Sequence, residues 1–154
     1  MKKIFAIGIV IIFIATIGVS VSAKSPVMVN TTFKTTMLYE KNTCTWEIID
    51  GGAWGRFYCL ERDYQTYVET LCKFAAYGLE PDTDYTIIAY HEDWPNVDFI
   101  GEATTDSSGY FINTSVLNFT PTDKIWVVLT SDICGEDHFI NWNPSEYLFE
   151  NNLI

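Results

Sequence analysis

The sequence predicts an all-β protein, an antiparallel sandwich of about seven to nine strands behind a short N-terminal leader. Two observations lead to this fold class. Beyond residue 24, apolar residues recur with a period of two, which is typical of strands that bury one face, and no long window repeats at helical spacing. Clusters of Gly, Pro, Asp, Asn and Ser interrupt these runs, as turns do in sandwiches and barrels.

The leader, residues 1–23, has the pattern of a secretory signal peptide. Two lysines precede the apolar run of residues 4–19, and Val21-Ser22-Ala23 supplies small residues where a signal peptidase cuts. A retained anchor is the alternative, since the run is just long enough to cross a bilayer. With cleavage, residues 24–154 form a single β-sandwich domain that is extracellular or at the cell surface.

Eight segments alternate strongly enough to be expected as strands. They are residues 27–33, 43–49, 55–62, 67–77, 84–90, 99–104, 109–117 and 124–131. Residues 146–154 are ambiguous and are a candidate for a last strand. Turn residues such as Asp50-Gly51-Gly52 separate these segments.

One hairpin can be argued residue by residue. If the third and fourth expected strands pair antiparallel with Cys59 opposite Cys72, Arg62 falls opposite Glu69 and apolar residues meet apolar residues. Cysteines that face each other at a non-hydrogen-bonded pair are within disulfide reach. We therefore expect a Cys59–Cys72 disulfide.

The remaining cysteines, Cys44 and Cys134, would form a second disulfide by elimination. Four cysteines allow three connectivities, and an exported chain favours oxidised pairs. A cysteine nucleophile is the alternative, but no local cysteine-protease signature surrounds any of the four. The sequence also lacks a Gly-x-Ser-x-Gly elbow and a His-Glu-x-x-His pair.

The chain is acidic, with a formal net charge of −11. Such a surface disfavours nucleic acid and anionic lipid, because both are bound by Lys and Arg that displace counterions. Membrane association is then expected only if the leader is retained. High negative charge serves solubility or selects a cation or a cationic partner.

Acceptor triplets for N-linked glycan begin at Asn30, Asn113 and Asn118, which predicts a glycoprotein. Each triplet ends in Ser or Thr and has no proline at its middle position.

No cofactor is expected, and calcium is the one metal to consider. Asp132, Glu136 and Asp137 offer the oxygen ligands that calcium prefers, on a loop that Gly135 allows to bend. The sequence does not match a calcium-loop pattern, and such carboxylates are equally typical of a solvated surface.

Three tryptophans, Trp54, Trp94 and Trp142, occur in segments rich in Gly, Pro or Asn. Exposed indoles there, with Asp93 beside Trp94, would stack on a glycan or anchor an envelope protein. The alternative is that they close the ends of the sandwich. We expect a non-catalytic binding or adhesion module and no enzyme; a secreted hydrolase with loop carboxylates and a structural envelope subunit are the alternatives.

The segment Leu79-Glu80-Pro81-Asp82-Thr83-Asp84-Tyr85 resembles the Leu-x-Pro-x-Thr-x-Tyr element of fibronectin type III domains. This resemblance implies an immunoglobulin- or fibronectin-like sandwich in which the hydroxyl of Tyr85 bonds back to the preceding turn. It implies no activity, because that family is defined by architecture.

A wider resemblance covers residues 46–55, 78–90, 124–129 and 141–150, which look like a group of small secreted proteins from methanogenic archaea. That group is of unknown function, so it implies no catalytic residues. The chain lacks a cysteine that these proteins carry near the position of Ile100.

Overall fold

The computed structural model describes residues 26–90, 95–121, 124–135 and 138–150. Within these ranges the chain forms strands and two short 3-10 turns. The elements are β1 (Met28–Tyr39), β2 (Trp54–Tyr64), β3 (Tyr67–Tyr77), β4 (Asp84–Tyr90), β5 (Val97–Thr104), β6 (Phe111–Leu117), β7 (Lys124–Leu129), η1 (Thr130–Asp132), β8 (Ile133–Cys134), β9 (His138–Phe139), η2 (Pro144–Glu146) and β10 (Leu148–Glu150).

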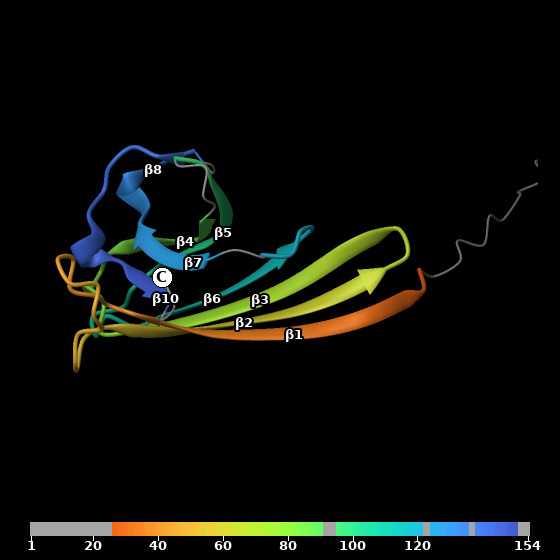
Figure 1. Cartoon of the computed structure of the whole chain (residues 1–154), viewed down its shortest axis with the longest axis horizontal. Helices are drawn as coiled ribbons and strands as arrows, with labels where there is room; N and C mark the ends of the chain where they lie inside the picture. The colour runs from red at the N-terminus through yellow and green to blue at the C-terminus, as the bar shows by residue number, and fades with distance from the viewer. Residues whose placement is uncertain (1–25, 91–94, 122–123, 136–137, 151–154) are drawn as a thin grey trace, which may run out of the picture.

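Eight strands form one antiparallel sheet in the order β5-β4-β7-β10-β1-β2-β3-β6. The sheet folds over, so that a long half (β1, β2, β3, β6) faces a short half (β5, β4, β7, β10) (Figure 1). The halves join where β10 pairs with Leu38 and Tyr39 at the end of β1. The predicted all-β antiparallel fold is confirmed, and its two layers are halves of a single sheet.

The two outermost strands of this sheet also approach each other. A Cβ on Gly101 of β5 would lie 2.6 Å from side-chain oxygens of Asn113 and Ser115 on β6. The Asn113 side chain donates a hydrogen bond of 2.8 Å to the carbonyl oxygen of Glu102 on β5. The sheet therefore nearly closes, because the side chains of β6 cover the edge of β5.

The core lies between the two halves. Side chains from the long half, including Leu38, Phe57 and Phe74, meet Tyr85 and Val127 from the short half, and all five are at most 1% exposed. A second cluster lies on the other side of the short half, where the loop around β8, β9 and η2 covers Trp126 and Phe149. Burial of this apolar surface is the main stabilising term for the fold.

The predicted hairpin is confirmed in full register. β2 and β3 pair with Cys59 opposite Cys72, and a disulfide joins them. Arg62 lies opposite Glu69 and forms an ion pair of 3.1 Å. The disulfide indicates an oxidising, non-cytosolic setting.

The prediction of a strand at residues 43–49 is wrong. This segment is a turn, because the Asn42 carboxamide oxygen accepts hydrogen bonds from the backbone N–H groups of Cys44 and Thr45, and Trp46 has a φ of 59°. A side chain that bonds the backbone in this way competes with strand pairing. The strand expected at 27–33 instead continues to Tyr39 and gives β1 its length.

The hairpin end of the long half extends past the short half (Figure 1). There Phe33 and the residues before it in β1 are exposed on both faces, unlike Leu38 at the other end. None of the helical turns that the structure describes is long and apolar enough to cross a membrane.

Candidate binding surfaces

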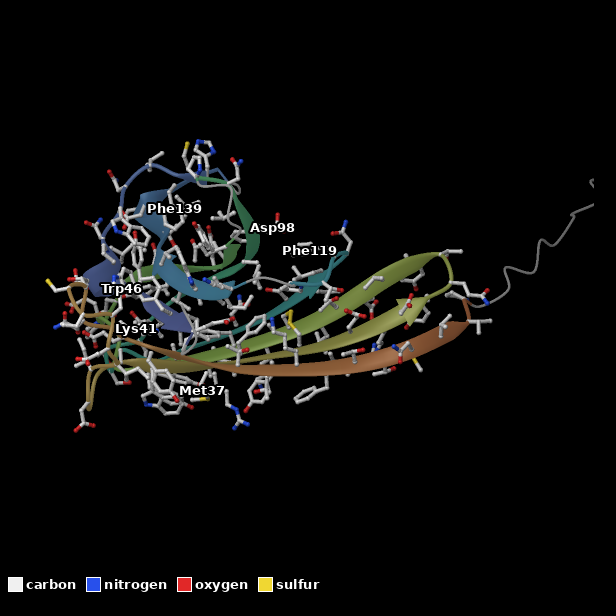
Figure 2. The ribbon with its side chains drawn as sticks, viewed as in Figure 1. Met37, Lys41, Trp46, Asp98, Phe119 and Phe139 are labelled. Carbon is white, nitrogen blue, oxygen red and sulfur yellow. A yellow bond between two sulfur atoms is a disulfide. The ribbon has the colours of Figure 1, made fainter. Side chains whose placement is uncertain are left out.

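The side of β1, β2, β3 and β6 that is turned away from the short half is called the outer face. Seven large apolar side chains on it are between 39% and 67% exposed: Met28, Phe33, Trp54, Tyr67, Tyr77, Ile112 and Val116. Met37 projects from the same face (Figure 2). In most antiparallel sheets the face opposite the core is polar, so this face is exceptional.

The strand register joins part of this apolar surface into one row. Phe33 lies opposite Leu60, Leu60 opposite Leu71, and Leu71 opposite Val116, so the row crosses all four strands. The pairing of Leu60 with Leu71 follows from the sequence. The extension of the row to β1 and β6 does not, because it depends on which strands flank the hairpin.

Aromatic rings on the outer face stack on one another. The Trp54 and Tyr77 rings are 4.5 Å apart at 22°, and the Tyr77 and Tyr110 rings are 4.9 Å apart. The Tyr77 ring therefore covers one flat face of the Trp54 ring, and the Tyr110 ring is tilted against Tyr77. Clustered, half-exposed aromatic rings of this kind are enriched where proteins contact one another.

The charge of the outer face differs from that of the whole chain. On this face the strand residues include three bases, Arg56, Arg62 and Lys73, against the single acid Glu69, whereas the chain has a net charge of −11. The Arg56 guanidinium lies 4.6 Å from the centre of the Tyr58 ring, in the geometry of a cation–π contact. The face is thus both apolar and basic.

The structure does not bring the predicted ligand-binding residues together. Trp54 is on the outer face, whereas Trp142 packs against Trp126 and Phe149 in the cluster on the short half and is 41% exposed. Asp93 and Trp94 lie outside the described residues. The remaining half-exposed indole, Trp46, packs against the same Phe149 ring at 5.3 Å (Figure 2).

The predicted metal ligand Asp132 is 1% exposed and has other partners. Its carboxylate accepts hydrogen bonds from the Asn143 side-chain amide at 2.9 Å and from the Tyr147 hydroxyl at 2.6 Å. Glu136 and Asp137 lie outside the described residues. Among the residues that are described, no group of three His, Cys, Asp or Glu side chains is arranged to hold a metal ion.

The expected bond between Cys44 and Cys134 is not formed. Both are free, exposed thiols, Cys44 in the turn that follows β1 and Cys134 in β8. They were expected to pair only because they were the two remaining cysteines, with no indication that they lie close together. Residues 43–49, which contain Cys44, form a turn and not the expected strand.

A cleft of about 200 Å³ at one end of the molecule is lined by Glu40, Glu80 and Glu146 beside Tyr85. The Tyr85 hydroxyl accepts a hydrogen bond of 3.3 Å from the backbone N–H of Glu80, the bond that the resemblance to the fibronectin type III element implied. Burial raises the pKa of Tyr85, and the three glutamates raise it further. The Glu40 carboxylate accepts a hydrogen bond of 2.8 Å from the backbone N–H of Ala53, so this side chain stabilises the fold.

The glycosylation triplets differ in accessibility. Asn30 and Asn118 are exposed, whereas Asn113 is partly buried and its amide faces β5.

No family model, no curated protein and no solved structure matches the chain.

Proposed function

We propose that this protein is a non-catalytic binding module that works outside the cell or at the cell surface, and that the outer face docks an acidic protein of the envelope. The observation that carries the proposal is the set of seven large apolar side chains, at least 39% exposed, on one sheet face. Contiguous exposed apolar surface of this kind marks interaction sites on soluble proteins.

Location outside the cytosol is supported by two features. Residues 1–23 have the composition of a secretory signal, and the Cys59–Cys72 disulfide requires an oxidising compartment.

The class of partner follows from charge and ring geometry. Three basic side chains and one acidic side chain on the outer face complement an acidic surface. The rings of Trp54, Tyr77 and Tyr110 form a cluster, which suits a protein interface. Aromatic and arginine side chains are also the residues that contribute most to protein interfaces.

The test replaces Ile112 and Val116, both on β6, with threonine. Threonine keeps the branched Cβ that strands favour and removes apolar contact area. Binding of the purified protein to its own cell-envelope fraction should weaken by about tenfold or more. The matched control is Ile140→Thr, because Ile140 is 57% exposed but lies after β9, away from the outer face.

The chemistry of the partner is tested separately with Lys73→Glu on β3. This variant should weaken envelope binding and reduce its dependence on salt, since a charge pair is lost. Unchanged binding by the β6 double variant, or equal loss in the Ile140 control, would refute the outer face as the site. Binding that survives protease treatment of the envelope would show that the partner is a glycan.

A further inference from the structure

Among the described residues, one of the two edges of β1 has no partner strand over most of its length. β2 pairs with β1 along its whole length, but β10 pairs on the other side only with Leu38 and Tyr39. In the described part of the chain, the stretch from Asn30 to Met37 therefore has an open edge. An open strand edge is a template for another strand.

The geometry of the disulfide shows which backbone groups lie on that edge. The Cα atoms of Cys59 and Cys72 are 4.3 Å apart, the spacing of a non-hydrogen-bonded pair. The N–H and C=O of Cys59 therefore point to β1, where its partner is Lys34. Alternation along the strand then places the N–H and C=O groups of Thr31, Phe33, Thr35 and Met37 on the open edge.

A hydrogen bond just after β1 supports this alternation in the direction of the backbone N–H and C=O groups. The N–H of Glu40 donates to the carbonyl oxygen of Ala53 at 2.9 Å, so even-numbered residues bond toward β2 and odd-numbered residues point to the other side. Tyr39 accordingly faces β10, where its partner is Phe149.

The charge along β1 suits pairing between two copies of the chain. β1 contains no Asp or Glu and a single basic residue, Lys34, in a chain with a net charge of −11. Two such molecules repel each other over most of their surfaces but bring no carboxylates together along this strand. We propose that two copies pair antiparallel through their open β1 edges and so join their sheets across a two-fold axis.

Lys34 and Tyr39 argue against two positions of the axis. An axis at Lys34 would set the two lysines opposite each other, and an axis at Thr35 would require Tyr39, which β10 already occupies. An axis at Phe33 keeps the two lysines apart, and only Met28, the first residue of β1, then comes opposite Leu38 of the partner subunit in the stretch that β10 occupies. This axis sets Phe33 opposite Phe33 of the partner subunit, and Thr31 opposite Thr35 of the partner subunit.

The same register gives Lys34 an acidic neighbour. Lys34 comes opposite Thr32 of the partner subunit, and Thr32 lies opposite Glu61 in its own sheet. The described ion pairs do not include Lys34. Thr32, Lys34 and Glu61 line a hollow of about 290 Å³ on the inner face beside the open edge, so a lysine from the second copy has room to reach Glu61.

The first experiment measures the mass of the purified protein by sedimentation equilibrium. The expected result is a concentration-dependent dimer that Thr35→Pro converts to a monomer, because proline removes an N–H from the open edge and leaves the bonds to β2 intact. Thr35→Ala is the matched control and should remain a dimer. Asn30→Gln protein is measured in parallel, so that a glycan on β1 cannot hide the pairing.

The second experiment tests the register in a Cys44→Ser, Cys134→Ser background, which removes the free thiols. Phe33→Cys should form a covalent dimer on mild oxidation, whereas Thr31→Cys should do so only when mixed with Thr35→Cys. A protein that stays monomeric, or a Thr35→Pro variant that dimerises as the wild type does, would overturn the proposal. These variants leave β6 unchanged, so a failure here is distinct from a failure of the outer face.

Discussion

The buried carboxylate of Asp132 fixes the loop that covers the short half of the sheet. Its oxygens accept hydrogen bonds from the side chains of Asn143 and Tyr147, and its own backbone carbonyl oxygen accepts the N–H of Ile140 at 2.8 Å. One residue thus ties together three points of the segment between β7 and β10. A buried charge needs such partners, because an unpaired one is costly to remove from water.

Tyr147→Phe tests this cluster. The variant should be less stable at neutral pH by about 1–3 kcal/mol, because a buried bond to a charged group is lost. Burial raises the pKa of Tyr147, and the bond to Asp132 raises it further. The unfolded chain therefore loses this proton near pH 10, while the folded chain keeps it, and stability falls as the pH rises above about 10.

Urea denaturation at pH near 7 and near 11 provides the measurement. The loss of stability between the two pH values should be smaller in Tyr147→Phe than in the wild type, although Tyr85, whose pKa burial also raises, still contributes. An equal loss in both proteins would mean that Tyr147 ionises normally in the fold.

At the scale of elements, the β2–β3 hairpin is stabilised by side-chain contacts between its strands more than by the sequence of its turn. β2 and β3 are joined through Gln65 and Thr66, which are not typical turn residues. The Tyr64 and Tyr67 rings on either side of this turn stack at 4.6 Å. Such contacts between the two strands, together with the Cys59–Cys72 disulfide, stabilise a hairpin whose turn sequence does not favour a turn by itself.

Gly51 and Gly109 share a backbone φ angle but have different surroundings. Alanine variants at these two positions therefore distinguish the cost of backbone strain from the cost of a steric clash. Gly51 and Gly109 both have a φ of 73°, but a Cβ on Gly51 would meet nothing within 4 Å, whereas one on Gly109 would lie 2.1 Å from the carbonyl oxygen of Leu79. Gly51→Ala should cost about 1–2 kcal/mol of stability, the strain of a left-handed residue. Gly109→Ala should cost clearly more, because the turn before β6 must move away from the turn before β4.

Thermal or urea unfolding of the two alanine variants makes the comparison. Equal destabilisation would show that the contact between Gly109 and Leu79 is readily relaxed.

At the scale of the whole molecule, the pairing of neighbouring strands could be predicted and the arrangement of distant ones could not. The register from Cys59 to Cys72 follows from side chains that face each other along a hairpin. The order β7-β10-β1 joins strands from opposite ends of the chain, and no local pattern encodes it. The outer face escaped prediction for the same reason, since the row from Phe33 to Val116 exists only once β1 and β6 flank the hairpin.

Because β5 and β6 nearly close the sheet, the acceptor sites at Asn113 and Asn118 should differ in glycosylation. Asn113 lies within β6 and Asn118 follows it directly, and the sequence alone treats their acceptor triplets alike. In the fold, Asn118 is exposed, whereas the Asn113 amide donates to the carbonyl oxygen of Glu102 and its carboxamide oxygen accepts the Ser115 hydroxyl at 2.8 Å. A glycan on the Asn113 nitrogen would have to displace β5 from β6.

Peptide mapping of the protein purified from its own cells should therefore find glycan on Asn118 and none on Asn113. The control is Gly101→Ala, which should push the Asn113 and Ser115 side chains aside and loosen the contact between the two strands, because its Cβ would lie 2.6 Å from their oxygens. Glycan on Asn113 should then appear or increase, while occupancy of Asn118 stays the same. Full occupancy of Asn113 in the unaltered protein would show that β5 and β6 do not close against each other when the glycan is attached, since a bulky group on that nitrogen cannot share the space between them.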